Sequence, residues 1–228
     1  MKLSGNTILI TGGSAGIGLA FAERFIKTGN KVIVCGRREE ALQQAKEKFP
    51  NLVTYVSDLS IEADRIKLFD WITANYPDVN VLVNNAGIQQ RFNVLKADAK
   101  TDWSYFNKEI TINMEASIQL SMLFAQYFAT KKEAAMHSFT VSLRHQLADT
   151  SVEVIEVAPP AVNTDLGGAG LHTSGEPLDA FADGIFQGLN EGKVEIGYGS
   201  SVNRLRMSRD EVDKHVENMY EAMKKTIE

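Results

Sequence analysis

The chain has 228 residues, of which 44% are hydrophobic and 23% charged, a composition typical of a globular protein and unlike collagen or a disordered chain. Its formal net charge of -5, without a long basic block, argues against nucleic acid or an anionic membrane surface as the main partner. No apolar run reaches the roughly 18 residues of a membrane-spanning helix, no signal peptide is evident, and the single cysteine, Cys35, leaves no intramolecular disulfide. These features predict a cytoplasmic protein with no membrane partner.

Strand-like and helix-like segments alternate along the chain. Strands are expected at short apolar runs and helices where apolar residues recur at helical spacing. In chain order we expect a strand at 7–11, a helix at 15–28, a strand at 31–35, a helix at 39–49, a strand at 52–56, a helix capped by Ser60 and ending near Tyr76, a strand at 79–84, helices at 101–128 and 133–148, a strand at 152–157, a helix at 178–189, a strand at 194–197, and a final helix that opens with a capping box of Ser208 and Glu211. This alternation predicts a single α/β domain over residues 1–228, a Rossmann-like, doubly wound parallel sheet in a three-layer α/β/α arrangement.

A glycine-rich turn, Thr11 to Gly18 (TGGSAGIG), lies between the first expected strand and the first expected helix. Glycines permit a tight turn and let the backbone approach a pyrophosphate, while the helix N-terminus offers free N–H groups. The position of the turn favours dinucleotide binding over the alternative, a tight turn without a ligand. A kinase-type phosphate loop is disfavoured because no Gly-Lys-Ser or Gly-Lys-Thr follows. The turn residues expected to contact the dinucleotide are Gly12, Ser14, Ala15, Gly16, Ile17 and Gly18.

The end of the second expected strand indicates which dinucleotide is bound. An NAD site typically has an acidic residue there for the ribose 2′-hydroxyl, whereas an arginine suits a 2′-phosphate. Here the strand ends with Gly36, Arg37 and Arg38, and a guanidinium group can bind a phosphate with paired hydrogen bonds. The sequence therefore favours NADP(H) over NAD(H), with Arg37 as the phosphate ligand. The alternative is that both arginines are ordinary solvated charges beside Glu39 and Glu40.

These motifs resemble those of the classical short-chain dehydrogenase/reductase family, and they occur in the family's order over most of the chain. The matching positions are Thr11 to Gly18 (T-G-x-x-x-G-x-G), Asp58, Asn84 to Gly87 (N-N-A-G), Asn113, and Pro159 to Thr164 (P-G-x-V-x-T, with Pro160 replacing the glycine). The sequence is also similar to bacterial oxidoreductases of the type found beside lipoteichoic acid D-alanylation genes.

The resemblance implies a role for each matching residue. Asp58 with Leu59 would lie at the adenine, Asn85, Ala86 and Gly87 near the ribose, and Val162 and Thr164 at the nicotinamide carboxamide, while Asn113 would be the asparagine of the catalytic tetrad. It also implies hydride transfer between NADP(H) and a small-molecule carbonyl or alcohol substrate, and assembly as a homodimer or homotetramer.

One part of the family pattern is absent from this sequence. No Ser followed by Tyr-x-x-x-Lys occurs after the helix that carries Asn113, and the strand that precedes them in the family is missing too. Tyr127 to Lys131 fits Tyr-x-x-x-Lys literally, but Tyr127 follows Asn113 too closely to leave room for a strand, so we interpret Tyr127 as a core residue. Either about two dozen residues are missing from the sequence near 129–138, or a deletion there is real. If residues are missing, we expect an interrupted sheet between the strands at 79–84 and 152–157, whereas a real deletion would leave these two strands directly paired.

Three functions are compatible with a glycine turn after a first strand. The first is the NADP-dependent oxidoreductase, and the second is a dinucleotide-binding protein without catalysis, which becomes the default if the deletion is real. A methyltransferase is disfavoured by Arg37 and by the Asn-Asn-Ala-Gly motif. No metal is expected, because the four histidines lack the spacing of metal ligands.

Overall fold

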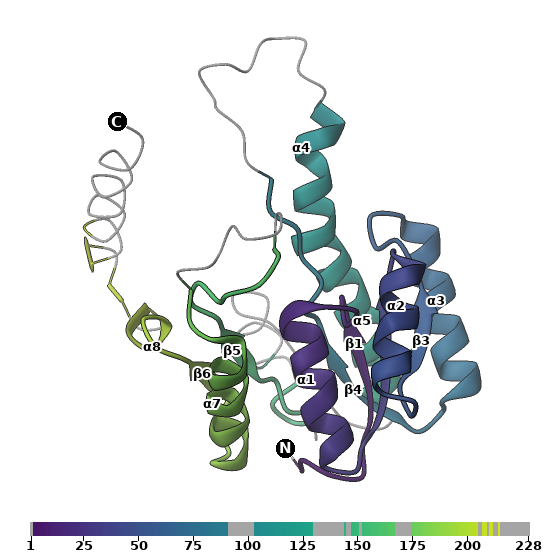
Figure 1. The fold of residues 1–228 in the computed structure, drawn as a ribbon, viewed down its shortest axis with the longest axis horizontal. Helices are drawn as coiled ribbons and strands as arrows, with labels where there is room; N and C mark the ends of the chain where they lie inside the picture. The colour runs from purple at the N-terminus through teal and green to yellow at the C-terminus, as the bar shows by residue number, and fades with distance from the viewer. Residues whose placement is uncertain are drawn as a thin grey trace.

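The computed structural model describes residues 2–90, 103–129, 144, 147–150, 152–166, 175–204, 207–208, 210–211 and 214. Strands and helices alternate in these residues, as the sequence predicts, and Figure 1 follows them along the ribbon. In chain order they are β1 (Thr7–Thr11), α1 (Gly16–Lys27), β2 (Lys31–Gly36), α2 (Glu39–Lys48), β3 (Val53–Val56), α3 (Glu62–Asn75), β4 (Val79–Val83), α4 (Trp103–Ile110), the π-helical turn η2 (Thr111–Glu115), α5 (Ala116–Ala129), β5 (Glu156–Ala158), α7 (Leu178–Asn190), β6 (Glu195–Gly197) and α8 (Ser201–Arg204).

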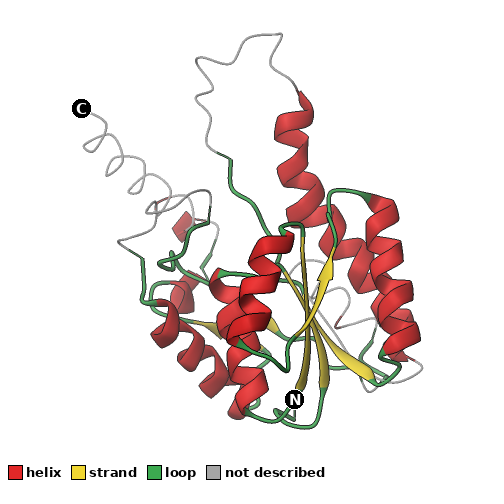
Figure 2. Cartoon of the chain, turned by 45° about the vertical axis from the view of Figure 1, so that its right-hand side comes forward, coloured by secondary structure: helices red, strands yellow, loops and turns green. Residues whose placement is uncertain are grey.

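Four parallel strands form the larger sheet, in the order β3-β2-β1-β4. All five residues of β1 are buried, and successive side chains point to opposite faces of the sheet. Ile8 and Ile10 pack with α1 and α2 on one face, whereas Leu9 packs with α3 and α5 on the other. Helices therefore cover both faces, as Figure 2 shows, and the expected Rossmann-like three-layer fold is confirmed.

The sheet is interrupted where the sequence lacks a strand. β5 pairs in parallel with β6 in a separate two-stranded sheet, and within the described residues β4 and β5 do not pair with each other. The expected interruption between these two strands is thus present. Nearly all of the expected break near 129–138 and most of the expected helix at 133–148 lie outside the described residues.

Two boundaries differ from the sequence prediction. The strand expected at 152–157 is only Glu156–Ala158, because its ladder partner β6 is only three residues long. Ser60 does not cap α3: the N-cap position is Ile61, and the Ser60 hydroxyl instead donates a hydrogen bond to Asp58.

The helix expected at 101–128 consists of α4 and α5 joined by the π-helical turn η2, a change of winding that hydrophobic periodicity does not reveal. At the start of the expected final helix, the capping box is present. The backbone N–H of Ser208 donates to Glu211 Oε2 (2.7 Å), and the N–H of Glu211 donates to Ser208 Oγ (3.4 Å).

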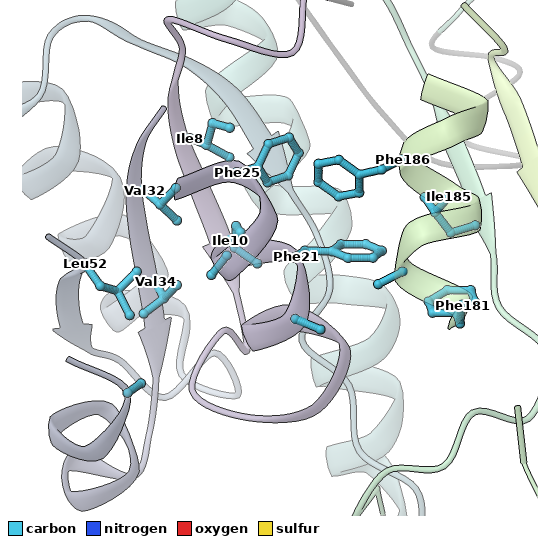
Figure 3. Close-up of a cluster of buried hydrophobic side chains, with 14 of the residues drawn as sticks. Ile8, Ile10, Phe21, Phe25, Val32, Val34, Leu52, Phe181, Ile185 and Phe186 are labelled. Carbon is cyan, nitrogen blue, oxygen red and sulfur yellow. The ribbon is translucent and has the colours of Figure 1, made fainter. Parts of the chain in front are cut away.

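Phenylalanines from α1 and α7 connect the two sheets through one hydrophobic core (Figure 3). Phe21 stacks on Phe181 with ring centroids 6.1 Å apart, and Phe25 contacts Phe186 at 4.7 Å. The same cluster includes Ile8 and Ile10 of β1 and Ile196 of β6. The small sheet is therefore held against the large one by helix packing, without a shared strand.

Phe181→Ala should lower the free energy of unfolding by about 3–5 kcal/mol, because this fully buried ring fills the contact between α1 and α7. The matched control is Val202→Ala on α8, where the side chain is 53% exposed and the loss should stay below about 0.5 kcal/mol. Urea unfolding measures both variants. Equal losses in the two would contradict the assignment of Phe181 to the connecting core.

Candidate dinucleotide-binding site

The candidate site lies at the carboxyl ends of β1, β2 and β4, where the loops after parallel strands meet. The glycine turn after β1 comes very close to the loop after β4: a Cβ atom on Gly12 would lie 2.8 Å from the Cα atom of Ala86. Gly12 also has a φ of 66°, in the region that favours glycine. A Cβ atom on Gly18 would overlap the side-chain amide of Asn85. Glycine at both positions lets these two loops touch.

Thr11 and Asn85 bind the two loops to each other. The Thr11 hydroxyl oxygen accepts the backbone N–H groups of Asn85 and Ala86, each at 3.0 Å, and donates to the carbonyl of Val83 at 3.3 Å. The Asn85 amide donates to the carbonyls of Thr11 (2.9 Å) and Gly12 (3.2 Å). The Asn85 amide therefore fixes the shape of the turn. Thr11 belongs to the motif, but sequence reasoning did not single it out, because its role depends on a strand that pairs with β1.

The N-terminus of α1 is suited to an anion. Its N-cap residue, Ala15, makes no side-chain hydrogen bond to the helix, and no acidic residue lies in the first turn. The first N–H groups of a helix have no intrahelical partners, and the helix dipole is positive at this end. A pyrophosphate beside the turn would therefore meet free N–H donors and no repelling carboxylate.

The segment around Val162 and Thr164 lies against the same turn. A Cβ atom on Gly16 would be 3.7 Å from the Thr164 Cβ atom. Val162 is buried, and its segment is held by hydrogen bonds from the Asn163 N–H to the Glu176 carbonyl (2.9 Å) and from the Glu176 N–H to the Ala161 carbonyl (2.8 Å). Two segments that are far apart in the sequence thus lie side by side.

Arg37 is exposed immediately after β2, beside the glycine turn. The Ser14 hydroxyl faces this strand end, since a Cβ atom on Gly36 would lie 3.4 Å from Ser14 Oγ. Among the residues that the structure describes, no carboxylate forms an ion pair with Arg37. Its guanidinium group is therefore available to an anionic ligand at the end of β2.

Asp58, after β3, lies among positive charges. It accepts hydrogen bonds from the N–H (2.9 Å) and the hydroxyl (2.7 Å) of Ser60. Burial favours the neutral carboxyl group, but the Ser60 hydrogen bonds and the charges of Lys108 and Arg37 outweigh burial and hold the pKa of Asp58 below its ordinary value. Asp58 is therefore an ionised acceptor at neutral pH. Sequence reasoning missed Lys108, because nothing in the sequence relates α4 to the loop after β3.

Asn113 lies in the π-helical turn η2 and holds the chain that leaves β4. Its Nδ2 group donates to the Ile88 carbonyl (2.8 Å), and its Oδ1 atom accepts the Ile88 N–H (2.9 Å). Gly87 precedes Ile88 in the chain, and a Cβ atom on Gly87 would lie 3.5 Å from Asn113 Oδ1. The structure therefore brings Asn113 to the Asn-Asn-Ala-Gly segment.

Tyr127 lies away from these residues. Its hydroxyl donates to the carbonyl of Pro77 (3.0 Å), just before β4 begins, whereas the candidate site is where β4 ends. Its ring contacts Phe69 edge to face, with centroids 6.0 Å apart. The interpretation of Tyr127 as a packing residue agrees with this position, and Lys131 lies outside the described residues.

The described residues contain neither a metal-binding cluster nor a membrane-spanning helix. No group of three or more His, Cys, Asp or Glu side chains there is arranged to hold a metal ion. None of the helices described combines the length and the apolar character needed to cross a membrane.

Gly12→Ala should weaken NADPH binding and lower stability by more than Gly29→Ala does. Gly29 also has a positive φ, 80°, but nothing lies within 4 Å of a Cβ atom there, so it isolates the backbone cost of about 1–2 kcal/mol. At Gly12 the overlap with Ala86 should add about 1–3 kcal/mol. Urea unfolding and NADPH fluorescence titration measure the two effects. Indistinguishable variants would show that the two loops do not need this contact.

Two solved structures share the arrangement of this chain. A short-chain dehydrogenase from Sphingobium yanoikuyae in complex with NADPH matches with a TM-score of 0.74 at 20% identity, covering 95% of each chain. A short-chain dehydrogenase/reductase from Burkholderia phymatum in complex with NAD matches with a TM-score of 0.75 at 18% identity, covering 94% of this chain and 96% of that one. At these identities the likeness establishes the fold.

A relative matches almost end to end. The uncharacterized oxidoreductase DltE of Bacillus subtilis (strain 168) is 38% identical over 254 residues, with 98% of each chain covered. This aligned length exceeds the 228 residues of the present chain. The relative therefore contains extra residues that align with gaps in this chain. Their number is at least the difference between these two lengths.

A model of the short chain dehydrogenase family matches residues 6–134, more than half of the chain. The matched region contains the glycine turn, Arg37, Asp58, the Asn-Asn-Ala-Gly segment and Asn113. The similarity to a bacterial oxidoreductase agrees with the resemblance seen in the sequence. On the family match and the near full-length relative together, this chain belongs to the short-chain dehydrogenase family.

Proposed function

We propose that this chain is an NADP(H)-dependent oxidoreductase that interconverts a small-molecule carbonyl compound and the corresponding alcohol. The observation that carries the proposal is the close contact between the glycine turn and the loop after β4, at the uncapped N-terminus of α1. When bound, the nicotinamide would supply or accept the hydride, and the protein would bind and orient the reactants.

We assign the residues of the site to the two ends of the dinucleotide. The turn from Gly12 to Gly18 and the first N–H groups of α1 would hold the pyrophosphate. At one end, Asp58 and Leu59 would face the adenine, with Arg37 and Ser14 near the 2′ position. At the other end, Ala86 and Gly87 would line the ribose, with Asn85 behind them, and Val162 and Thr164 would receive the carboxamide.

The preference for NADP(H) rests on the charges at the end of β2. The solved structures with this fold were obtained with NADPH in one case and NAD in the other, so the fold alone does not select. Arg37 is exposed there, immediately after the strand. A guanidinium group offers paired N–H donors to a phosphate. No acidic residue takes the place that would bind a 2′-hydroxyl.

We locate the residues that the Bacillus relative has and this chain lacks at the end of the family match, near residue 134. The interruption between β4 and β5 supports this location, because one further strand between them would join the two sheets. The resemblance puts the Ser and Tyr-x-x-x-Lys of the family in this segment, and the Tyr would exchange the hydroxyl proton. Asn113 is the tetrad residue that this chain retains.

Arg37→Ala should weaken NADPH binding by about 1.5–3 kcal/mol, the range for a hydrogen bond to a charged group, and leave NADH binding nearly unchanged. Arg38→Ala is the matched control and should change neither. Fluorescence titration of the reduced cofactors measures all three proteins. Equal losses for NADPH and NADH would reject Arg37 as the phosphate ligand.

The same preparations test the reaction. Loss of NADPH absorbance with a panel of aldehydes and ketones is expected if the oxidoreductase function is correct. Binding of NADPH without turnover of any of them would reject catalysis and leave a dinucleotide-binding protein. Intact mass spectrometry of the protein from its natural source shows whether its mass exceeds the 25.2 kDa of this chain.

We also propose that the protein is cytoplasmic and forms a homodimer or homotetramer through the helices around Asn113. Ile110, Met114 and Met122 on these helices are 48%, 57% and 53% exposed, and an exposed apolar surface of this kind suits a symmetric contact. Light scattering should give a dimeric or tetrameric mass. Replacing Met114 and Met122 by Glu should lower that mass, whereas Val202→Glu should not. A monomeric wild-type protein at micromolar concentration would overturn the proposal.

A further inference from the structure

Arg65, on α3, is the most unusual buried residue in the described part of the chain. Its side chain is 1% exposed, although arginine is almost never fully buried unless it is paired. It precedes the buried residues Leu68 and Ile72 on α3, and it is the largest of the fully buried side chains. The roles assigned above to the dinucleotide site do not involve it.

The Arg65 guanidinium group joins three parts of the protein. Its Nη1 atom donates to the carbonyl of Leu59 (2.7 Å), in the loop after β3. Its Nη2 atom donates to Glu115 Oε1 (2.6 Å) at the end of η2, and its Nε atom donates to Gln119 Oε1 on α5. The three nitrogen atoms of the fork thus hold the loop of Asp58 and Leu59 against the helix that carries Asn113.

Other hydrogen bonds of this loop lie within it. The N–H groups of Ser60 and Ile61 donate to the Asp58 carboxylate (2.9 Å) and the Asp58 carbonyl (3.0 Å), so the loop is tied mainly to itself. On the other side, Glu115 is close in sequence to Asn113, which holds both polar backbone groups of Ile88. The loop at Asp58 is therefore connected to the chain after β4 by the hydrogen bonds of Arg65, the short stretch of chain from Glu115 to Asn113, and the hydrogen bonds of Asn113.

Stability alone does not account for an arginine at this position. Removing a guanidinium group from water costs several kcal/mol, and well-packed apolar residues in place of a buried ion pair are often equally or more stable. What an apolar residue does not provide is a fixed distance between three backbone segments, which the planar fork of arginine sets.

We propose that Arg65 is a positioning residue that fixes the loop of Asp58 and Leu59 for the adenosine half of the dinucleotide. The inference rests on the proposed function, because it assigns that loop to the adenine. Arg65 itself would not touch the cofactor. It would act through its hydrogen bond to the Leu59 carbonyl. Loss of Arg65 should therefore weaken binding of the adenosine half, and the affinity for the whole cofactor should fall by the same factor.

The test compares Arg65→Met with Arg24→Met in the full chain. Arg24 is a matched control: its side chain is 14% exposed and donates to Asp183 (2.7 Å) and Asp179 (3.1 Å), which lie on α7. Calorimetry with 2′,5′-ADP and fluorescence titration with NADPH give the dissociation constants. We expect Arg65→Met to raise both by at least about tenfold and by similar factors, as for a lost hydrogen bond to a charged group. Arg24→Met should raise neither.

Hydrogen exchange gives a readout without any ligand. In Arg65→Met the amides of Ser57, Ser60 and Ile61 should exchange faster than in the wild type, while those of β1 should not. If Arg65→Met does not fold, Glu115→Ala takes its place, because Glu115 is 57% exposed and its removal frees one end of the fork. Glu115→Ala should raise the dissociation constants of 2′,5′-ADP and NADPH by the same factor, and that factor should be smaller than the one for Arg65→Met.

The outcomes separate this inference from the proposed function. A folded Arg65→Met protein that binds 2′,5′-ADP as tightly as the wild type would overturn the inference alone. A loss for NADPH without a loss for 2′,5′-ADP would do the same, because the effect would then lie outside the adenosine half. A wild-type protein that binds neither ligand would overturn the proposed function and the inference together.

Discussion

The contact between the glycine turn and the loop after β4 is the constraint on which the candidate site depends. Thr11 has one hydroxyl group, which accepts two N–H groups and donates to one carbonyl, all from the segment Val83 to Ala86. Its hydrogen-bonding capacity is thus used entirely between two neighbouring strands. Because the backbones touch at Gly12 and Ala86, the position of the start of α1 is fixed by the neighbouring strands β1 and β4. The helix end proposed to bind the pyrophosphate is therefore positioned directly by the strands of the sheet.

The interruption of the sheet explains why the candidate site is well formed on one side. Most of the residues that would bind the dinucleotide follow β1, β2, β3 and β4, which form an unbroken ladder, whereas Val162 and Thr164 follow β5 of the separate sheet. Beyond β4 the described residues continue in a separate pair of strands. The excess of the Bacillus alignment over this chain, 254 residues against 228, is long enough for a strand and the connection to it. Under the proposed function, most of the cofactor half of the site would rest on the intact sheet, whereas the proton-transfer half would depend on the segment beyond it.

Sequence reasoning predicted the first four strands closely because each is a short run rich in apolar and β-branched residues, which is a local property. It misplaced β5, because a strand's length depends on its partners, and β6 pairs with three residues only. It predicted Ser60 as the N-cap of α3, but the Ser60 hydroxyl donates to the Asp58 carboxylate instead. The glycine turn was evident from its spacing. The places of Asp58, Asn113 and Thr164 came from family resemblance, because hydrophobic patterns carry no information about which loops meet.

Arg65 and Lys108 show a different limit. A charged residue on the apolar face of α3, in line with Leu68 and Ile72, was a visible signal, but its partners Glu115 and Gln119 lie much further along the chain. Lys108 gave no signal at all. Both are defined by tertiary contacts between helices, so only the assembled fold identifies them.

The phenylalanine cluster between α1 and α7 also bears on how the chain is made. A ribosome releases Phe21 and Phe25 long before it adds Phe181 and Phe186, their partners across the core. Throughout that interval the nascent chain can complete the four-stranded ladder but cannot cover the outer side of α1. Contacts of such sequence separation form slowly, and uncovered aromatic surface favours aggregation. The packing of α7 against α1 is thus a late step of synthesis, and until it occurs this aromatic surface of α1 stays open to aggregation.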